Sequence, residues 1–154
     1  MPTSTTTIRR ARSYDLSTDI LYRLLKLRVE VFVVEQGCAY PELDGRDLER
    51  ETRHYWIEAG DDVICTLRLL EEHEAGVKTY RIGRLCTRPE YRGQGHTRRL
   101  LQAALAEVGS TPCRILAQTY LADMYSEYGF VPTGPDVVED GIPHRPMERV
   151  ATNR

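Results

Sequence analysis

The chain has 154 residues, of which 41% are hydrophobic and 29% are charged, and its formal net charge at pH 7 is -2. A chain of this length is typical of one domain that buries roughly 70% of its unfolded surface, so neither disulfides nor a metal is needed for folding. The nearly balanced charge argues against nonspecific binding to nucleic acid, and the apolar runs are shorter than the ~20 residues that span a membrane.

The first half of the chain is predicted to begin with a strand at residues 8–14 and a helix that Ser17 caps. The apolar residues of this helix recur at steps of three and four, which predicts one buried face: Ile20, Leu21, Leu24, Leu25, Leu27 and Val31. Residues 37–52 carry two glycines, one proline and five acidic residues, and we expect a loop there. Residues 53–58 and 63–70 flank Gly60-Asp61-Asp62, which predicts a β-hairpin.

The second half is predicted to continue with a charged connection at residues 71–76 and a strand at 77–87. A second amphipathic helix is expected to begin near Gly95 and to end at Gly109. Residues 114–118 are predicted to form a buried strand, 121–128 a short helix ended by Gly129, and the tail one or two strands. The order β-α-β-β-β-α-β-α-β indicates one α/β or α+β domain over residues 1–154.

The four cysteines are Cys38, Cys65, Cys86 and Cys113. Their separations of 27, 21 and 27 residues match neither a zinc site nor a redox pair, so we expect no metal. Reduced thiols and the lack of an apolar leader at the N-terminus favour a cytoplasmic location.

A glycine loop lies between the strand at 77–87 and the second helix, in the stretch that runs from Arg88 to Leu101. Glycines let the backbone approach a ligand, and the free N–H groups of a helix start attract phosphate. Arg98 and Arg99 lie against the helix dipole at a cost of ~0.3–1 kcal/mol that a bound polyphosphate would reverse, and Arg92 adds charge. The loop therefore predicts an anion cradle, and the structural alternative is a tight turn with solvated arginines. It lacks the Gly-Lys-Ser/Thr of a P-loop, and Arg98 replaces the third glycine of a dinucleotide motif.

Two motifs resemble those of the GNAT N-acetyltransferase superfamily. Arg92-x-x-Gly95-x-Thr97, preceded by Pro89-Glu90-Tyr91, is similar to the acyl-CoA-binding motif, with Thr97 where Gly or Ala is usual. Tyr125-x-x-x-Gly129-Phe130 resembles the helix that carries the catalytic tyrosine, with Gln118 on the preceding strand where Asn is more common.

Further segments are similar to the ElaA-like branch of this superfamily. They are Leu27-Arg28-x-x-Val31-Phe32-Val33-Val34-Glu35-Gln36, Cys38-x-Tyr40, Asp44-Gly45-x-Asp47, Thr52-x-His54 and Glu139-Asp140-Gly141-Ile142-Pro143-His144. Together these segments span most of the chain between Leu21 and Met147.

The resemblance implies a mixed, mostly antiparallel sheet flanked by helices and splayed at the acyl-CoA site. It implies acetyl-CoA as co-substrate, with its pyrophosphate on the glycine loop and its pantetheine arm beside the central strand. The residues that would bind it are Leu85, Cys86, Thr87, Arg92, Gly93, Gln94, Gly95, His96, Thr97 and Gln118. In this scheme an amine attacks the thioester, a backbone N–H near Cys86 stabilises the oxyanion, and Tyr125 protonates the leaving thiolate.

The general base is less clear, because the central strand offers Arg81, Gly83 and Arg84 where many GNAT enzymes place a glutamate. Glu35 and His54 are the first candidates for this catalytic role. The other candidates are Asp44, Asp47 and His144, and the carboxylates are equally suited to hold a cationic amine. Each has a structural alternative: a solvated loop, a helix cap or a histidine hydrogen bond. Tyr125 can likewise be a core aromatic and Cys86 a small buried apolar residue.

The leading hypothesis is an N-acetyltransferase that acts on a small amine or on an exposed amine of a protein, with no nucleic acid or membrane partner. A non-catalytic acyl-CoA-binding module or sensor is the alternative, supported by the missing glutamate. A nucleotide-binding regulator fits less well, because the nucleotide motifs fail. A homodimer through edge strands near the C-terminus stays open.

Overall fold

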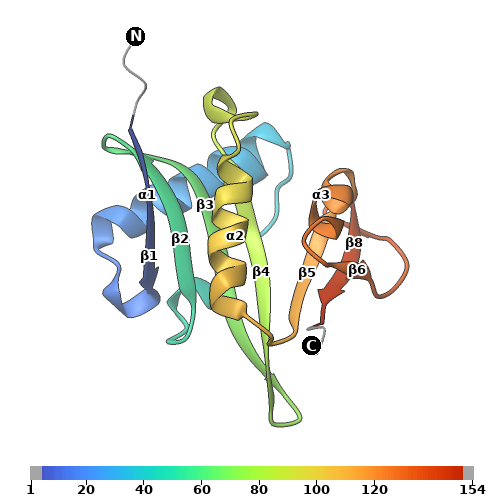
Figure 1. Cartoon of the computed structure of the whole chain (residues 1–154). Helices are drawn as coiled ribbons and strands as arrows, with labels where there is room; N and C mark the ends of the chain where they lie inside the picture. The colour runs from blue at the N-terminus through green and yellow to red at the C-terminus, as the bar shows by residue number, and fades with distance from the viewer. Residues whose placement is uncertain (1–4, 151–154) are drawn as a thin grey trace.

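The computed structural model describes residues 5–150 and shows a mixed sheet with helices on both faces (Figure 1). The strands are β1 Thr6–Arg12, β2 Arg53–Ala59, β3 Asp62–Glu74, β4 Val77–Thr87, β5 Cys113–Gln118, β6 Val131–Pro132, β7 Val137–Glu139 and β8 Ile142–Arg149. The helices are α1 Thr18–Val29, α2 His96–Val108 and α3 Ala122–Ser126. This order confirms the predicted succession of elements up to α3, and the tail forms three short strands where we expected one or two.

The sheet runs in the order β1-β2-β3-β4-β5-β8-β6, and β7 pairs with β8. Among the described strands only β4 and β5 pair in parallel, and the other neighbours are antiparallel. In Figure 1, α2 lies in front of the central strands and α1 behind them. The sheet is therefore mixed and mostly antiparallel, as the sequence predicts.

The first helix begins as its cap predicts and ends in an unexpected way. The Ser17 hydroxyl accepts a hydrogen bond from the Ile20 amide at 3.1 Å. After α1 the backbone continues as a π-helical stretch, Glu30–Glu35, which no periodicity in the sequence had indicated. π-Helical stretches are rare in proteins, and those that occur are frequently found at functional sites.

The connection predicted at residues 71–76 is wrong, because β3 and β4 run through it. The strands pair as far as Glu74 and Val77, and only Ala75 and Gly76 form the turn. Both turn residues have positive φ, 52° and 80°, as a two-residue hairpin turn requires. The end of this hairpin projects beyond the other strands (Figure 1). Its charged residues hid the strand because His73 and Glu74 are exposed and Glu71 and Glu72 pair with arginines instead of packing in an apolar core.

Two apolar clusters fill the two faces of the sheet. The larger lies beneath α2 and α3 and includes Leu67, Ile82, Leu101 and Ile115. The smaller lies beneath α1 and is made by Leu24, Leu27, Val31, Trp56, Val63 and Cys86. Because side chains alternate along a strand, each residue of β4 can be assigned to one of these faces.

The parallel pair separates soon after it begins, which confirms the predicted splay. The β4–β5 ladder covers Tyr80–Ile82 and Cys113–Ile115, so the ends of both strands lie apart. The β4 strand also bulges here, because Gly83 pairs with Arg68 and Cys86 with Thr66, leaving one extra residue in β4. Arg84 at this bulge has a φ of +52°, an uncommon backbone conformation for a residue other than glycine.

No helix within residues 5–150 has the length and apolar character required to cross a bilayer. Over the same range, no three residues among His, Cys, Asp and Glu are grouped so as to hold a metal ion. The four cysteines are free thiols.

Candidate active site

A cleft of about 730 Å³ opens where β4 and β5 separate. Its lining includes Leu85 and Tyr125 from the α2 face of the sheet and Val31 and Cys86 from the α1 face. The opening therefore passes through the sheet and can admit reactants from both faces.

The glycine loop forms one end of this cleft. Gly93 and Gly95 have φ values of +75° and +83°, which side chains other than glycine rarely adopt. Gly95 is the N-cap of α2 without a side-chain cap, and the first amide bonded within the helix is that of Arg99, to the Gly95 carbonyl at 3.1 Å. The amides of residues 96–98 thus lack a helical partner at the positive end of the dipole. An anion of two phosphates fits this chemistry.

Nine of the ten residues predicted to bind the co-substrate line this cleft. They are Leu85, Cys86, Thr87, Arg92, Gly93, Gly95, His96, Thr97 and Gln118. Gln94 is the exception, and its side-chain amide donates to the Glu90 carbonyl at 3.4 Å. The hydroxyl oxygen of Thr97 lies 3.0 Å from that of Thr87 on β4, so the Thr97 side chain does not occupy the space inside the glycine loop.

A histidine at the start of α2 gives further evidence for a ligand at the loop. The His96 side chain is buried, and its Nε2 has no hydrogen-bond partner among the described residues. Burial, with the charge of Arg99 adding to it, lowers the pKa of His96. A buried polar atom without a partner beside uncapped amides indicates a place for a ligand that can donate or accept hydrogen bonds.

Arg92 and Glu35 form a bidentate ion pair across the mouth of the cleft. The two guanidinium N–H groups donate to the carboxylate at 2.6 and 2.7 Å, and Arg92 Nε donates to the Thr87 carbonyl at 3.0 Å. This pairing lowers the pKa of Glu35, so the carboxylate is a weak base. The structure therefore makes Glu35 a partner of the loop rather than a free acceptor of protons.

The arginines at the start of α2 also have protein partners. Arg98 pairs with Glu127 at 2.6 Å, and Arg99 donates to the Thr6 hydroxyl at 2.9 Å. Their unfavourable place against the helix dipole is thus offset within the protein. The uncapped amides, rather than these two side chains, carry the argument for an anion site.

Tyr125 lies in the wall of the cleft on the α2 side. Its ring packs edge-on against Phe130 with centroids 5.9 Å apart, and the side chain is 3% exposed. Burial raises the pKa of Tyr125, so the phenol keeps its proton at neutral pH. The core and catalytic interpretations of this tyrosine are compatible, because it packs in the core and also lines the cleft.

The backbone of β4 faces the cleft opposite Tyr125. Beyond Ile82 it has no β5 partner, so some N–H and C=O groups of Leu85–Thr87 are free to pair with an extended ligand. The Cys86 thiol is buried, and burial raises its pKa well above the ordinary value. A thiol in this state is not a nucleophile, which agrees with the interpretation of Cys86 as a small apolar residue.

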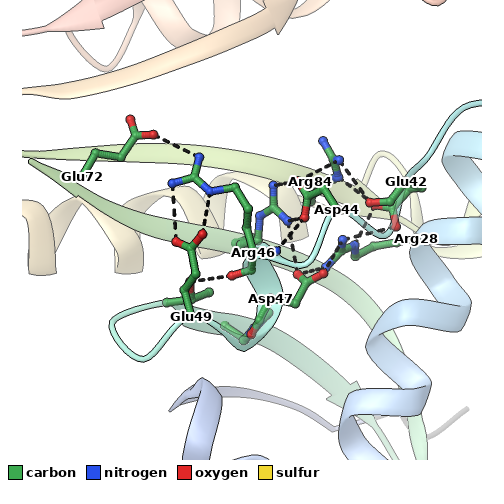
Figure 2. A network of polar contacts seen from close by, with 11 residues as sticks. Arg28, Glu42, Asp44, Arg46, Asp47, Glu49, Glu72 and Arg84 are labelled. Atoms are coloured by element: carbon green, nitrogen blue, oxygen red, sulfur yellow. Dashed lines mark hydrogen bonds and ion pairs between the residues drawn. The ribbon is translucent and has the colours of Figure 1, made fainter.

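A buried ionic network joins α1, the loop at 37–52 and the sheet (Figure 2). Arg28 is 1% exposed, donates to Glu42 at 2.8 Å and also binds Asp47. Arg68 in turn forms ion pairs with both Asp47 and Asp44. Arg68 holds Asp44 at 2.8 and 3.0 Å. These pairs explain how several charged groups persist in the interior, since a buried charge without a partner is costly.

The network removes two candidates for the general base. Although burial opposes it, hydrogen bonds from Arg68 and the Arg46 amide lower the pKa of Asp44 to about 2. Burial likewise opposes the shift at Asp47, and Arg28 lowers its pKa. Carboxylates held in this way are structural, and neither is free to accept a proton near neutral pH.

His54 and His144 differ in position. His54 is 1% exposed, its Nε2 lies 3.1 Å from the Asp47 carbonyl oxygen, and it does not line the cleft. Burial lowers its pKa. The structure thus does not bring His54 to the other candidates, because β2 holds it within the network. His144 on β8 lines the cleft, and its Nδ1 lies 2.8 Å from the Ile142 carbonyl oxygen, which can only accept a hydrogen bond. Neutral His144 therefore carries its proton on Nδ1, and its Nε2 has no hydrogen-bond partner within residues 5–150.

Sequence reasoning missed the part that Arg46 and Arg68 play in the cleft wall. One signal was available for Arg68, which stands between Leu67 and Leu69 in a strand that reads as buried. An arginine in such a strand requires a carboxylate partner, and the acidic loop at 37–52 supplies it.

Comparison with known proteins agrees with this geometry. Residues 26–151 match the family described as the acetyltransferase (GNAT) domain. The chain belongs to the GNAT acetyltransferase family. A UPF0039 protein of Mycobacterium tuberculosis is 63% identical to it over 146 residues, 94% of each chain.

Two crystal structures of related proteins have the same fold as this chain. An acyl-CoA N-acyltransferase from Pseudomonas aeruginosa is 40% identical, with a TM-score of 0.84 over 94% of this chain and 99% of that one. ElaA of Escherichia coli is 32% identical, with a TM-score of 0.87 over the same shares. The fold and family are thus those of an acyltransferase that takes its acyl group from an acyl-CoA thioester. Within this family the chain is ElaA-like.

Proposed function

We propose that the protein is an N-acetyltransferase that transfers the acetyl group of acetyl-CoA to a primary amine. The observation that carries the proposal is the cleft through the sheet, which joins the uncapped start of α2, the unpaired edge of β4 and Tyr125. This arrangement lets a long, anionic thioester enter from the α2 face and an amine from the α1 face. Acetyl-CoA supplies the activated acyl group when bound.

The residues that would hold acetyl-CoA fit its chemistry in order along the cleft. The amides at the start of α2 suit the pyrophosphate, and the free edge of Leu85–Thr87 suits the amide groups of the pantetheine arm. A free N–H near Cys86 would stabilise the oxyanion of the attacked carbonyl, which is typically worth roughly 2.7–4 kcal/mol of the barrier.

Two side chains would move protons. The buried phenol of Tyr125 would donate its proton to the departing thiolate, since it stays neutral at pH 7. His144 would accept the proton of the acceptor ammonium at Nε2, because its Nδ1 is engaged with the Ile142 carbonyl. Of the five candidates for the base, His144 is the one that lines the cleft without an ion pair among the described residues.

We also infer a cytoplasmic location and an acceptor that is either a small amine or an exposed amine of a protein. The four free thiols support the location, because disulfides are rare in that compartment. The exposed side chains of Val131 and Val138 at the C-terminal edge of the sheet leave room for a homodimer there.

Thermal unfolding with and without acetyl-CoA, with ATP as control, tests the co-substrate. At a hundredfold excess over the dissociation constant, ligand binding stabilises by ~2.7 kcal/mol, or roughly 5–10 °C for a domain of this size. A shift with acetyl-CoA alone is expected. Equal shifts with both ligands would favour a nucleotide-binding protein, and no shift would refute the acetyl-CoA site.

Release of coenzyme A in the presence of amines then tests transfer. A His144→Gln variant should lose most of the rate near pH 7 and regain it at higher pH, where the amine loses its own proton. A pH profile unchanged from the wild type would remove His144 from the mechanism. Binding of acetyl-CoA without transfer to any amine would identify a binding module instead.

A further inference from the structure

The wall of the cleft on the α1 face is rich in arginine. Tyr80 and Ile82 point into the cluster beneath α2, so Arg81 and Gly83 lie on the opposite face of β4. Four arginines line the cleft on this side: Arg46, Arg68, Arg81 and Arg84. Most of the carboxylates that pair with these arginines do not line the cleft. Figure 2 shows Arg46 in contact with Glu49 and Glu72, and Arg84 in contact with Glu42. The network thus turns its donors, more than its acceptors, toward the cleft.

Two of these arginines keep donors to spare. Arg81 binds Glu72 through Nε alone at 2.9 Å, and its side chain is 36% exposed. Arg84 Nε lies 2.8 Å from a carboxylate oxygen of Glu42, and its Nη2 donates to the Glu42 carbonyl at 3.1 Å and to Asp44 at 3.4 Å, so Nη1 is the group without a partner among the described residues. The free Nη1–Nη2 edge of Arg81 matches the two oxygens of a carboxylate, and Nη1 of Arg84 can add one more donor.

The backbone between these two side chains leaves room for a ligand. A Cβ built on Gly83 meets no atom within 4 Å, so no side chain fills the space beside the strand at this position between Arg81 and Arg84. The positive φ of Arg84 is a strained conformation, and such strain persists where the surrounding structure maintains it, often at binding sites. Both features place the unpaired donors of Arg81 and Arg84 beside an open space in the cleft.

A different part of the lining is acidic. Glu139 and Asp140, at the turn before β8, are exposed and line the cleft together with His144. Neither carboxylate forms an ion pair with another described residue. An ammonium group at His144 would therefore meet negative charge, and an anionic group at the arginines would meet positive charge.

We propose that the acetyl acceptor is a small amine that also carries a carboxylate, which Arg81 and Arg84 bind beside Gly83. This inference rests on the proposed function, and it names the class of acceptor. A carboxylate site of this kind would make amino acids better acceptors than amines without an acidic group.

The test compares the twenty standard amino acids, β-alanine and 4-aminobutyrate with the matching carboxamides and decarboxylated amines, measured by coenzyme A release. At least one carboxylate-bearing acceptor should have a kcat/KM more than tenfold above its carboxamide. In an Arg81→Gln variant this ratio should fall at least tenfold through a higher KM for the acid. The control is Arg114→Gln, because Arg114 is equally exposed, pairs with Glu74 and does not line the cleft.

The outcomes separate the two proposals. Turnover of amines with no preference for the carboxylate, or a ratio that Arg81→Gln leaves unchanged, overturns the assignment of the acceptor and leaves the transferase intact. Binding of acetyl-CoA without turnover of any amine overturns both. Equal effects of Arg81→Gln and Arg114→Gln would show a general loss of positive charge and would also overturn the assignment.

Discussion

At the scale of single residues, the partners of each ionisable group decide what it can do. Glu35, Asp44 and Asp47 have the side chains of general bases, yet arginine partners lower the pKa of each. Tyr125 has the opposite environment, because burial raises its pKa and no charged group compensates. The cleft is therefore lined by two carboxylates that are weak bases, Glu35 and Asp44, and by a phenol that keeps its proton, Tyr125.

The Tyr125→Phe variant tests the retained proton. It removes one hydroxyl and keeps the edge-on contact with Phe130, so the stability and the affinity for acetyl-CoA should stay unchanged. The kcat for transfer should fall by about 100-fold or more, the usual contribution of a positioned acid. The matched control is Tyr128→Phe, which lies outside the cleft. Equal kcat values for the wild type and Tyr125→Phe would leave Tyr125 as a core aromatic.

At the scale of elements, the short ladder between β4 and β5 creates the site. A parallel pair that continued past Ile82 and Ile115 would close the sheet and satisfy the edge of β4. The bulge in β4 then shifts the alternation by one residue, so that Gly83 and Cys86 both belong to the α1 face. Separation and bulge together open the sheet without disturbing the cores on its two faces.

A Gly83→Leu variant tests this opening. The position lacks the positive φ that strains other residues and has open space around it, so the chain should fold with an unchanged melting temperature. The leucine would fill the cleft on the α1 face, and kcat/KM for the acceptor should fall more than tenfold while acetyl-CoA still stabilises the protein. Gly134→Leu is the control, since Gly134 also lacks positive φ and lies outside the cleft. Full activity of Gly83→Leu would place the acceptor elsewhere.

At the scale of the whole molecule, the ionic network makes stability depend on pH. The pKa of Asp44 is about 2 in the folded state and 3.8 without its partners, so the unfolded chain takes up protons first as pH falls. His54 acts in the same direction, because its folded pKa lies below 6.5 and the unfolded imidazole gains a proton earlier. The stability that His54 and Asp44 contribute is therefore present above their unfolded pKa values and is lost as pH falls, through His54 first and the carboxylate after it.

Urea unfolding at several pH values checks this. The free energy of unfolding should decline below about pH 6.5 and more steeply below about pH 4. An Asp44→Asn variant should lose roughly 1–2 kcal/mol at pH 7 and show a shallower decline in acid, since the ionised carboxylate is the stabilising form. Asp136→Asn, at an exposed pair with Arg145, should change little. Parallel pH curves for Asp44→Asn and the wild type would contradict this account.

The sequence by itself determined the features that depend on neighbours along the chain. Ser17 and Gly95 start their helices where the spacing predicts, and the glycine loop follows its strand. Most of the residues predicted to bind the co-substrate line one cleft with Tyr125. Capping, positive φ and helical period act over a few residues, so local patterns carry them. The polar end of β3 was not predicted because its charged residues do not show the alternation of apolar and polar side chains that indicates a strand: Glu71 and Glu72 pair with arginines, and His73 and Glu74 are exposed.

Only the tertiary structure decided which charges meet. Glu35 lies 57 residues from Arg92, and Arg28 lies 14 and 19 residues from Glu42 and Asp47. Such pairs depend on how the sheet and α1 pack around them and on how much water that packing removes. For the same reason, spacing alone could not separate His144, in the cleft, from His54, beneath the network.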